Sequence, residues 1–127
     1  MLRLIKIIFL LFTLNIFYSN FTFANNFSLS ECTQISEVVN KDVPKIIDKV
    51  TTLTGTICTL GPIFIYNYQV DNSIDYIPDS FDVKLRKQWC SNPRFRVLID
   101  GFKEINFEYY KNNGYFVKTI VISKKHC

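Results

Sequence analysis

The sequence has a single histidine, His126, and only four glycines among its 127 residues. Nucleophilic and acid–base catalysis need a base held rigidly beside the group that it activates, and His126, next to the final cysteine, is poorly placed for that role. Each glycine is explained by a turn, a strand or a helix cap, and none belongs to a glycine-rich phosphate loop ahead of a helix. We therefore expect no catalytic residue, no cofactor-binding residue and no enzymatic activity.

The usual metal-binding patterns are missing as well. The sequence has no Cys-x-x-Cys pair, and one histidine is too few for most zinc sites. Four aspartates, Asp71, Asp75, Asp79 and Asp82, lie close together, but the central glycine and closing glutamate of an EF-hand are absent. We interpret these carboxylates as loop and helix-capping groups, and we predict no metal site.

The beginning of the sequence is typical of a secretory signal peptide. Two basic residues precede an apolar run at 7–17, and Thr22-Phe23-Ala24 resembles the small-x-small cleavage pattern. The run is shorter than the roughly 20 apolar residues of a transmembrane helix, so an uncleaved anchor is the less favoured alternative. We predict a signal peptide at 1–24 and one exported domain, periplasmic or secreted, at 25–127, with no stable membrane span after cleavage.

All four cysteines lie in the predicted mature part, at Cys32, Cys58, Cys90 and Cys127. An even number of cysteines in an exported chain predicts two disulfides. Each disulfide would contribute roughly 2 to 4 kcal/mol, a large share of the stability of a small domain. Four cysteines allow three connectivities, and the sequence spacing does not choose among them.

Charge is distributed unevenly along the mature part. Residues 25–83 carry three Lys and Arg against eight Asp and Glu, whereas residues 84–127 carry ten against three. The two parts can complement one another within the fold, or the basic part can form a surface for an anionic partner. Nearby tyrosines such as Tyr66 and Tyr109 could stack on bases, but an exported protein seldom meets nucleic acid, so we expect no nucleic-acid partner.

Sequence patterns predict a helix at the beginning of the mature part. Ser28-x-x-Glu31 has the form of a capping box, and apolar residues follow at helical spacing. Pro44 cannot continue the hydrogen-bond ladder of a helix, so we expect a break near 40–43 and a second short helix with Pro44 in its first turn.

Two more helices are predicted in the middle of the sequence. Phe81, Leu85 and Trp89 recur at i, i+4 and i+8, with Asp79 or Ser80 as the cap. Asn92-Pro93 is a typical start for the next helix, and we expect Gly101 to end it in a left-handed conformation.

Two hairpins are predicted from residue types and turn signals. Residues 52–59 and 63–70 flank Leu60-Gly61-Pro62, and Asn113-Gly114 is the preferred type I′ turn between two alternating strands. In the second hairpin this turn places Ile105, Phe107 and Tyr109 opposite Ile122, Ile120 and Lys118. In the first hairpin, pairing Thr59 with Pro62 would put Cys58 on the face opposite Phe64, and a one-residue shift in the turn would reverse that face.

These elements predict an α+β fold in the order α-ββ-α-ββ. The economical architecture is a four-stranded antiparallel sheet of two hairpins, stapled by disulfides, with helices packed mainly on one face.

Several spaced residues resemble a group of small exported bacterial proteins that have no assigned activity. The residues that carry the resemblance are Val43-Pro44-x-x-Ile47-Asp48-x-x-Thr51-x-Leu53, Tyr66-x-Tyr68, Cys90-x-x-Pro93-x-x-Arg96-x-Leu98-x-x-Gly101, Tyr109, Gly114 and Cys127. The resemblance implies a periplasmic or secreted bacterial protein with a disulfide between Cys90 and Cys127. Cys32 and Cys58 lie outside the pattern, so they are left to pair with each other.

We predict a non-enzymatic binding or accessory protein of the bacterial cell envelope that recognises a protein partner in a secretion-accessory, inhibitor or immunity role. The candidate surfaces are a strand edge, the acidic loop at 71–82 and a basic face. That basic face comprises Lys84, Arg86, Lys87, Arg94 and Arg96. The alternatives are a small secreted enzyme or toxin, and a binder of anionic lipid or cell-wall polymer that uses the basic part of the chain.

Overall fold

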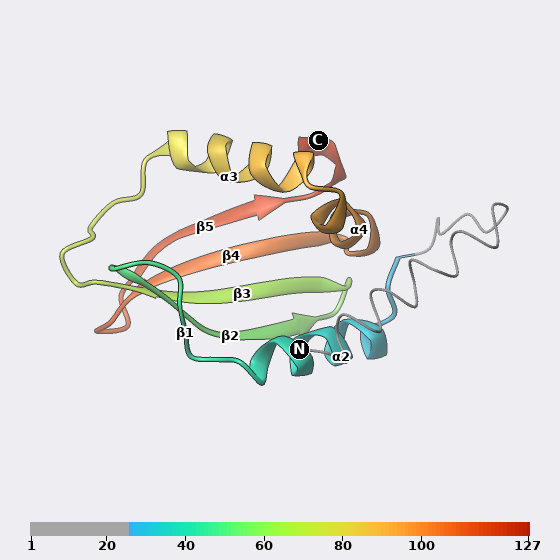
Figure 1. Ribbon diagram of the computed structural model, residues 1–127, viewed down its shortest axis with the longest axis horizontal. Coiled ribbons are helices and arrows are strands. Elements are labelled where there is room, and N and C mark those ends of the chain that lie inside the picture. Colours follow the sequence, from blue (N-terminus) through green and yellow to red (C-terminus); the bar gives the residue numbers. More distant parts are fainter. Residues whose placement is uncertain (1–25) are drawn as a thin grey trace, which may run out of the picture.

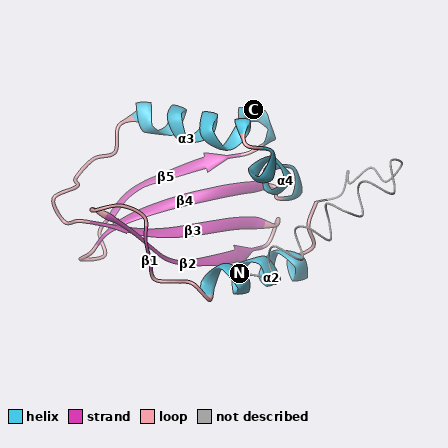
Figure 2. Cartoon of the chain, in the orientation of Figure 1, coloured by secondary structure: helices cyan, strands magenta, loops and turns pink. Residues whose placement is uncertain are grey.

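Five strands form one sheet in the order β1-β2-β3-β4-β5 in the computed structural model, which describes residues Asn26–Cys127. The predicted signal peptide at 1–24 lies outside the described residues. The elements are α2 (Leu29–Asn40), β1 (Lys45–Ile46), β2 (Thr51–Thr59), β3 (Ile63–Val70), α3 (Asp79–Ser91), α4 (Pro93–Gly101), β4 (Glu104–Lys111), β5 (Phe116–Ile122) and the 3₁₀ turn η1 (Lys124–His126). These helices and strands form an α+β fold (Figure 2).

The sheet is mixed, so the prediction of a four-stranded antiparallel sheet is wrong. Strands β3 and β4 are parallel, and the other neighbouring strands are antiparallel. After β3 the chain returns along the sheet through α3 and α4, so β4 starts at the same end as β3 and runs in the same direction (Figure 1). The fifth strand is β1, which forms after Pro44 where a second short helix was expected.

The three helices lie on one face of the sheet, as predicted. Helix α2 runs beside β2, α3 runs beside β5, and α4 lies at one end between them (Figure 1). Their buried side chains Cys32, Trp89 and Ile99 join one core with alternate residues of the strands. The fully buried strand residues of this core include Phe64, Ile105, Phe107, Ile120 and Ile122.

The second hairpin has the predicted register from Ile105 to Tyr109, where Phe107 pairs with Ile120. The predicted type I′ turn is wrong, because Gly114 has a positive φ but Asn113 does not, and the register shifts after Tyr109 so that Tyr110 pairs with Phe116. The first hairpin differs by one residue from the register we had considered. Thr59 pairs with Ile63, which places Cys58 opposite Phe64 on the core face. A bulge between Leu53 and Gly55 shifts the register, so that Leu53 near the start of β2 and Cys58 near its end both face the core.

The disulfide that the family resemblance implies, Cys90–Cys127, is present, and so is the remaining pair, Cys32–Cys58. Cys32 bonds to Cys58 and joins α2 to β2, with their Cα atoms 5.9 Å apart. Cys90 bonds to Cys127 and joins the end of α3 to the segment after β5, with their Cα atoms 5.3 Å apart. The one-residue shift in the first turn is what brings Cys58 to the helix-covered face.

Helix caps agree with the sequence at two of three starts. The amide of Glu31 donates to Oγ of Ser28 at 3.1 Å, which forms half of the predicted capping box, and the amide of Arg94 donates to Oδ1 of Asn92 at 3.0 Å. The prediction for α3 is wrong, because Pro78 occupies the N-cap without a side-chain hydrogen bond. Helix α3 begins at Asp79, and Pro78 before it has an extended backbone. The sequence pattern locates such a boundary only to within one or two residues.

Gly101 does not adopt the predicted left-handed conformation. It is the last residue of α4, and the glycines with positive φ are Gly61 and Gly114. A Cβ atom at Gly101 would overlap the ring of Phe27, whose amide donates to the Gly101 carbonyl at 2.7 Å. Glycine is therefore required here by a close approach of two chain segments and not by a turn.

Asn40, the last residue of α2, supplies a partner for the open edge of β2. Its Oδ1 accepts from the amide of Thr56 at 2.7 Å, and its Nδ2 donates to the Thr56 carbonyl at 2.9 Å. Oγ of Ser36 adds a bond to the same carbonyl at 3.0 Å. The Asn40 side chain thus pairs with the β2 backbone as a neighbouring strand would.

We expect Asn40→Ala to lower the free energy of unfolding by about 2 kcal/mol, since the amide of the buried Thr56 loses its partner. Urea unfolding measures this loss. Gln34→Ala, at an exposed position of the same helix, is the matched control and should change stability by less than about 0.5 kcal/mol. Equal effects of the two substitutions would contradict the proposed role of Asn40.

Candidate functional site

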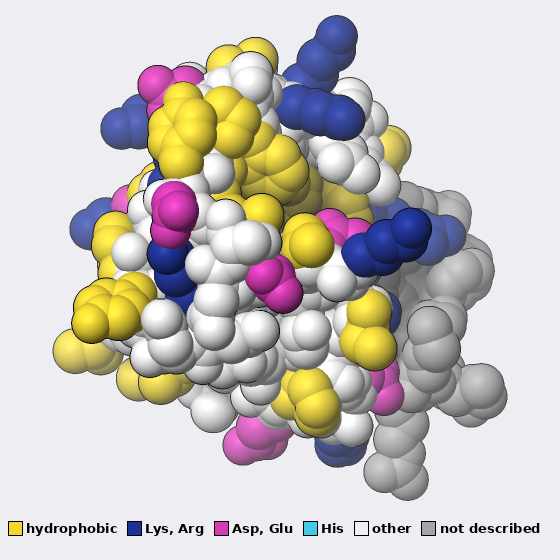
Figure 3. All heavy atoms as spheres, turned by 90° about the vertical axis from the view of Figure 1, so that its left-hand side faces the viewer, with side chains coloured by type: hydrophobic (Ala, Val, Ile, Leu, Met, Phe, Trp, Pro, Cys, Tyr) yellow, Lys and Arg dark blue, Asp and Glu magenta, His cyan; other side chains and the backbone are white. Residues whose placement is uncertain are grey.

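A groove opens on the helix-covered face of the sheet, between α3 and the segment that joins β1 to β2. Its volume is about 570 Å³. The nonpolar and aromatic residues that line it are Ile47, Val50, Tyr68, Val70, Ile74, Tyr76, Ile77, Pro78, Phe81, Leu85, Trp89, Phe95, Phe107 and Tyr109. Seen from this end of the molecule, hydrophobic side chains gather in one area and continue into a recess (Figure 3). We call this feature the aromatic groove.

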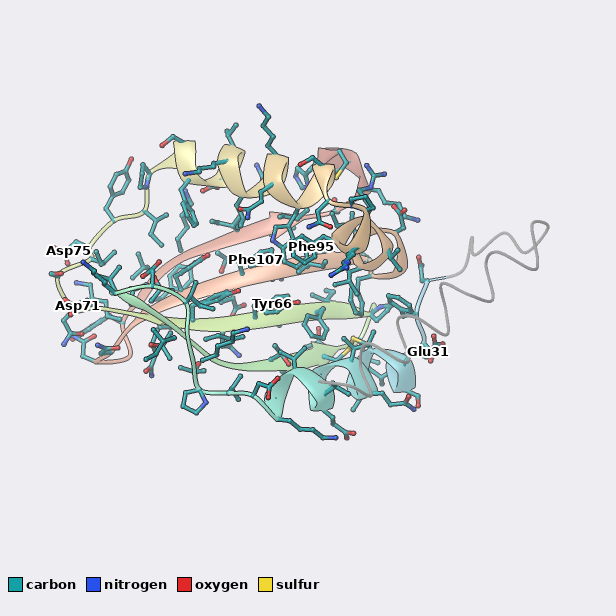
Figure 4. All side chains as sticks on the ribbon, viewed as in Figure 1. Glu31, Tyr66, Asp71, Asp75, Phe95 and Phe107 are labelled. Atoms are coloured by element: carbon teal, nitrogen blue, oxygen red, sulfur yellow. A yellow bond between two sulfur atoms is a disulfide. The ribbon has the colours of Figure 1, made fainter. Side chains whose placement is uncertain are left out.

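The floor of the aromatic groove follows from the parallel pairing of β3 with β4. Tyr68 lies opposite Tyr109, and their rings stack with centroids 5.0 Å apart. Two residues earlier in each strand, the ring of Tyr66 stacks on that of Phe107 with centroids 5.2 Å apart (Figure 4). Because alternate residues of a strand face the same side, both stacked pairs lie on the helix-covered face.

One end of the aromatic groove is closed by a cluster around Trp89, the only tryptophan in the sequence. Its ring stacks on Phe95 of α4 at 4.2 Å and meets Phe107 edge to face at 5.0 Å. Figure 4 shows Phe95 and Phe107 close together between the sheet and α4. Such packed aromatic pairs hold one another in place, so this end of the groove is preformed.

The mouth of the aromatic groove exposes large hydrophobic side chains. Ile47, Val50, Tyr76 and Phe81 line it and are between 37% and 72% exposed. They come from the β1–β2 segment, the loop before α3 and the first turn of α3. Exposed nonpolar groups that are contiguous around a recess are typical of surfaces that bind another molecule.

Tyr68 and Tyr109 place two phenol groups in the aromatic groove. Burial raises the pKa of Tyr68 to about 12. Burial also raises the pKa of Tyr109, with smaller contributions from Tyr68, Asp48 and Asp82. Both phenols therefore stay protonated at neutral pH and can donate to an acceptor on a bound molecule. A nucleophilic phenol would need a lowered pKa, whereas the pKa of each of these two tyrosines is raised.

The acidic loop borders the groove and is tied to the second hairpin. Lys111 pairs with Asp75, and Nζ of Lys118 lies 2.8 Å from Asp79 and 2.7 Å from Asp82. Hydrogen bonding to Lys118 holds the pKa of Asp79 below its usual value. Three of the four loop aspartates are thus paired with two lysines, and Asp79 and Asp82 share Lys118. The described residues contain no group of three or more His, Cys, Asp and Glu that could hold a metal ion.

The five basic residues singled out from the sequence do not form one face. Lys84 lies on the aromatic groove. Arg86, Lys87 and Arg96 line a second recess beside the Cys90–Cys127 disulfide. Arg94 is exposed in the first turn of α4 and borders neither recess. Helical spacing explains the separation, since Lys84 and Arg86 lie two residues apart and point to different sides of α3.

The fold is similar to three solved bacterial structures. It superposes on the crystal structure of a Pseudomonas aeruginosa protein that is predicted to be secreted, with a TM-score of 0.68 and 18% identity over 77% of this chain and 90% of that one. It also superposes on two pilotins of type II secretion systems. EpsS from Vibrio vulnificus gives a TM-score of 0.62 with 10% identity over 76% of this chain and 87% of that one. AspS from Vibrio cholerae gives 0.60 with 9% identity over 76% and 88%.

The sequence matches no protein-family profile and no curated protein at a significant level. At these identities the structural likeness establishes the fold. Within the described part of the chain, no helix is both long enough and apolar enough to span a bilayer.

The aromatic groove was not predicted from the sequence. Its residues are spread from Ile47 to Tyr109, and the antiparallel arrangement expected for the sheet did not bring Tyr68 beside Tyr109. A signal was available in the alternation Phe64, Tyr66, Tyr68, which places three aromatic rings on one face. We interpret that alternation as core from the sequence; in the structure Phe64 is buried in the core, and Tyr68 lines the groove.

Proposed function

We propose that this chain is an exported accessory protein of the bacterial cell envelope that binds a nonpolar segment of a protein partner in the aromatic groove. The observation that carries the proposal is the ring of exposed hydrophobic residues around a preformed aromatic recess. The two disulfides and the fold shared with a predicted secreted protein and with pilotins support an envelope location. Among the roles expected from the sequence, the fold favours the secretion-accessory one.

The chemistry of the groove suits an amphipathic segment. Its floor is aromatic, its mouth carries aliphatic and aromatic side chains, and Asp48, Lys84 and Gln88 lie at its border. A partner segment would bury nonpolar side chains against Tyr68 and Trp89 and leave its polar side toward these border residues. Helix-in-groove recognition works in this way, with a few nonpolar anchors supplying most of the affinity. That the chain is not an enzyme stays a prediction.

Site-specific photocrosslinking in the native envelope tests this proposal. Benzoylphenylalanine at Tyr76, which is 72% exposed at the groove mouth, should give a discrete crosslinked partner. The same group at Phe116, which is 59% exposed and lies outside the groove lining, should give at least fivefold less of that product. Aromatic residues occupy both positions, so the fold should tolerate both replacements.

A pair of neighbouring isoleucines supplies the matched control for that experiment. Ile47 lines the groove, whereas Ile46, which is more exposed, does not. Ile47→Asp should lower the yield of the Tyr76 crosslink by about tenfold, since a carboxylate at the mouth must be desolvated on binding, and Ile46→Asp should leave it within about twofold. Equal crosslinking at Tyr76 and Phe116, or equal effects of the two aspartates, would overturn the proposed groove function.

A further inference from the structure

A second recess lies at the other end of α3, away from the mouth of the aromatic groove. It is a shallow pocket of about 580 Å³ beside the Cys90–Cys127 disulfide. Four of its lining residues carry basic side chains: Arg86 and Lys87 from α3, Arg96 from α4 and His126 from η1. None of its lining residues is an aspartate or glutamate. We call it the basic pocket.

Arg86 is held in place within the basic pocket by the sheet. Its Nε donates to the carbonyl of Val121 at 3.0 Å, at the outer edge of β5. This bond fixes the guanidinium and leaves its terminal Nη groups for another acceptor. The ion pairs among residues 26–127 involve neither Arg86 nor Lys87, and Arg96 has only a partly exposed contact of 3.7 Å with Asp100.

His126 adds a neutral hydrogen-bond donor to these cations. The amide of Ser123 donates to Nδ1 of His126 at 2.9 Å, so the proton of the neutral ring lies on Nε2. Burial, followed by the charges of Arg86 and Lys125, lowers the pKa of His126. The ring is therefore uncharged at neutral pH in the absence of an anion.

Two helices thus place three cationic side chains around one recess. Arg86 and Lys87 make no ion pair among residues 26–127, and Arg96 makes one long contact. A single carboxylate carries one negative charge, whereas a phosphate monoester carries about 1.5 to 2 and offers three acceptor oxygens. Arginine and lysine side chains that converge from separate elements match such a multiply charged group. We propose that the basic pocket binds a phosphate group, either free or at the head of a lipid, through Arg86, Lys87, Arg96 and His126.

The single histidine makes the proposal measurable by NMR, because one imidazole signal reports on the pocket. Inorganic phosphate at millimolar concentration should raise the pKa of His126 by roughly half a unit, since a nearby anion favours the imidazolium. Sodium chloride at the same ionic strength should not. Lys87→Gln and Arg96→Gln should each raise the dissociation constant for phosphate by at least about threefold, because each removes one charge-assisted hydrogen bond.

Arg94→Gln is the matched control, because Arg94 lies on the same helix as Arg96 but outside the basic pocket. Vesicles of phosphatidylcholine with and without phosphatidic acid separate the two sources of the phosphate. Retention on phosphatidic acid vesicles that is lost in Lys87→Gln and kept in Arg94→Gln assigns the lipid headgroup, and a response to inorganic phosphate without vesicle retention assigns the free ion. A His126 titration that is the same in phosphate and chloride, or that responds equally in Arg94→Gln and Arg96→Gln, would overturn the proposal.

Discussion

Replacing both Cys32 and Cys58 with alanine is expected to lower the free energy of unfolding by about 4 kcal/mol. The 26-residue separation of the two cysteines corresponds to roughly 3.5 kcal/mol of lost constraint on the unfolded chain. Cys32 is fully buried in the core, so removing its sulfur adds a small cavity and a further fraction of a kcal/mol. Urea unfolding of the oxidised parent and the double variant measures the difference.

The other disulfide provides the comparison for this prediction. Cys90 and Cys127 are 37 residues apart, and Cys127 is exposed, so their replacement by alanine should cost a similar entropic amount without the core cavity. Losing the Cys32–Cys58 bridge should in addition speed hydrogen exchange in α2, because that bridge attaches α2 to β2. A loss below about 1 kcal/mol for the Cys32 and Cys58 pair would show that the bridge does not constrain this fold.

Local features of this chain could be predicted from the sequence because they depend on neighbouring residues. The Ser28 and Glu31 capping box and the start of α4 at Asn92 each follow from backbone geometry within a few positions. In the second hairpin the alternation of nonpolar residues fixes which pairs face the core, although the turn is not the expected type I′. The Cys90–Cys127 pair came instead from the family resemblance, since spacing left three choices open, and Cys32 and Cys58 were the remaining pair.

The features that could not be predicted depend on how distant segments pair. The direction of β4 relative to β3 depends on where α3 and α4 carry the chain, and no local pattern in Glu104–Lys111 encodes it. The face of Cys58 depends on one residue of turn length and on the bulge after Leu53. The aromatic groove follows from the parallel pairing, which brings Tyr68 beside Tyr109. The basic pocket combines residues of α3, α4 and η1 that only the fold brings together.

Helix α3 connects the two proposed sites. Leu85 and Trp89 face the aromatic groove, and Arg86 and Cys90 lie one position further around the helix, on the basic pocket. If both proposals hold, one helix contributes a nonpolar side to a protein-binding surface and a cationic side to an anion-binding surface. A protein that binds a partner segment on one side of α3 and a phosphate group on the other could hold that partner near an anionic surface. This joint role requires both proposals and fails with either one.

Gly101→Ala is expected to lower the free energy of unfolding by about 2 kcal/mol, although alanine normally favours a helix over glycine. The added Cβ would occupy the position of the Phe27 ring, which packs on Phe102 with centroids 4.8 Å apart. Phe27 is near the beginning of the described chain and can swing away. The cost is therefore bounded by the loss of its partly buried ring and of the hydrogen bond from its amide to the Gly101 carbonyl.

A double-mutant cycle separates this explanation from a general effect of changing the helix end. Phe27→Ala alone should cost about the same 2 kcal/mol, because it removes the same contact. Once the ring is gone, Gly101→Ala should be neutral or stabilising by up to about 0.5 kcal/mol, since the alanine then fits and reduces the entropy of the unfolded chain. The sign of the Gly101→Ala effect should thus depend on Phe27. A cost of Gly101→Ala that persists unchanged in the Phe27→Ala background would mean that the segment before α2 does not dock on α4.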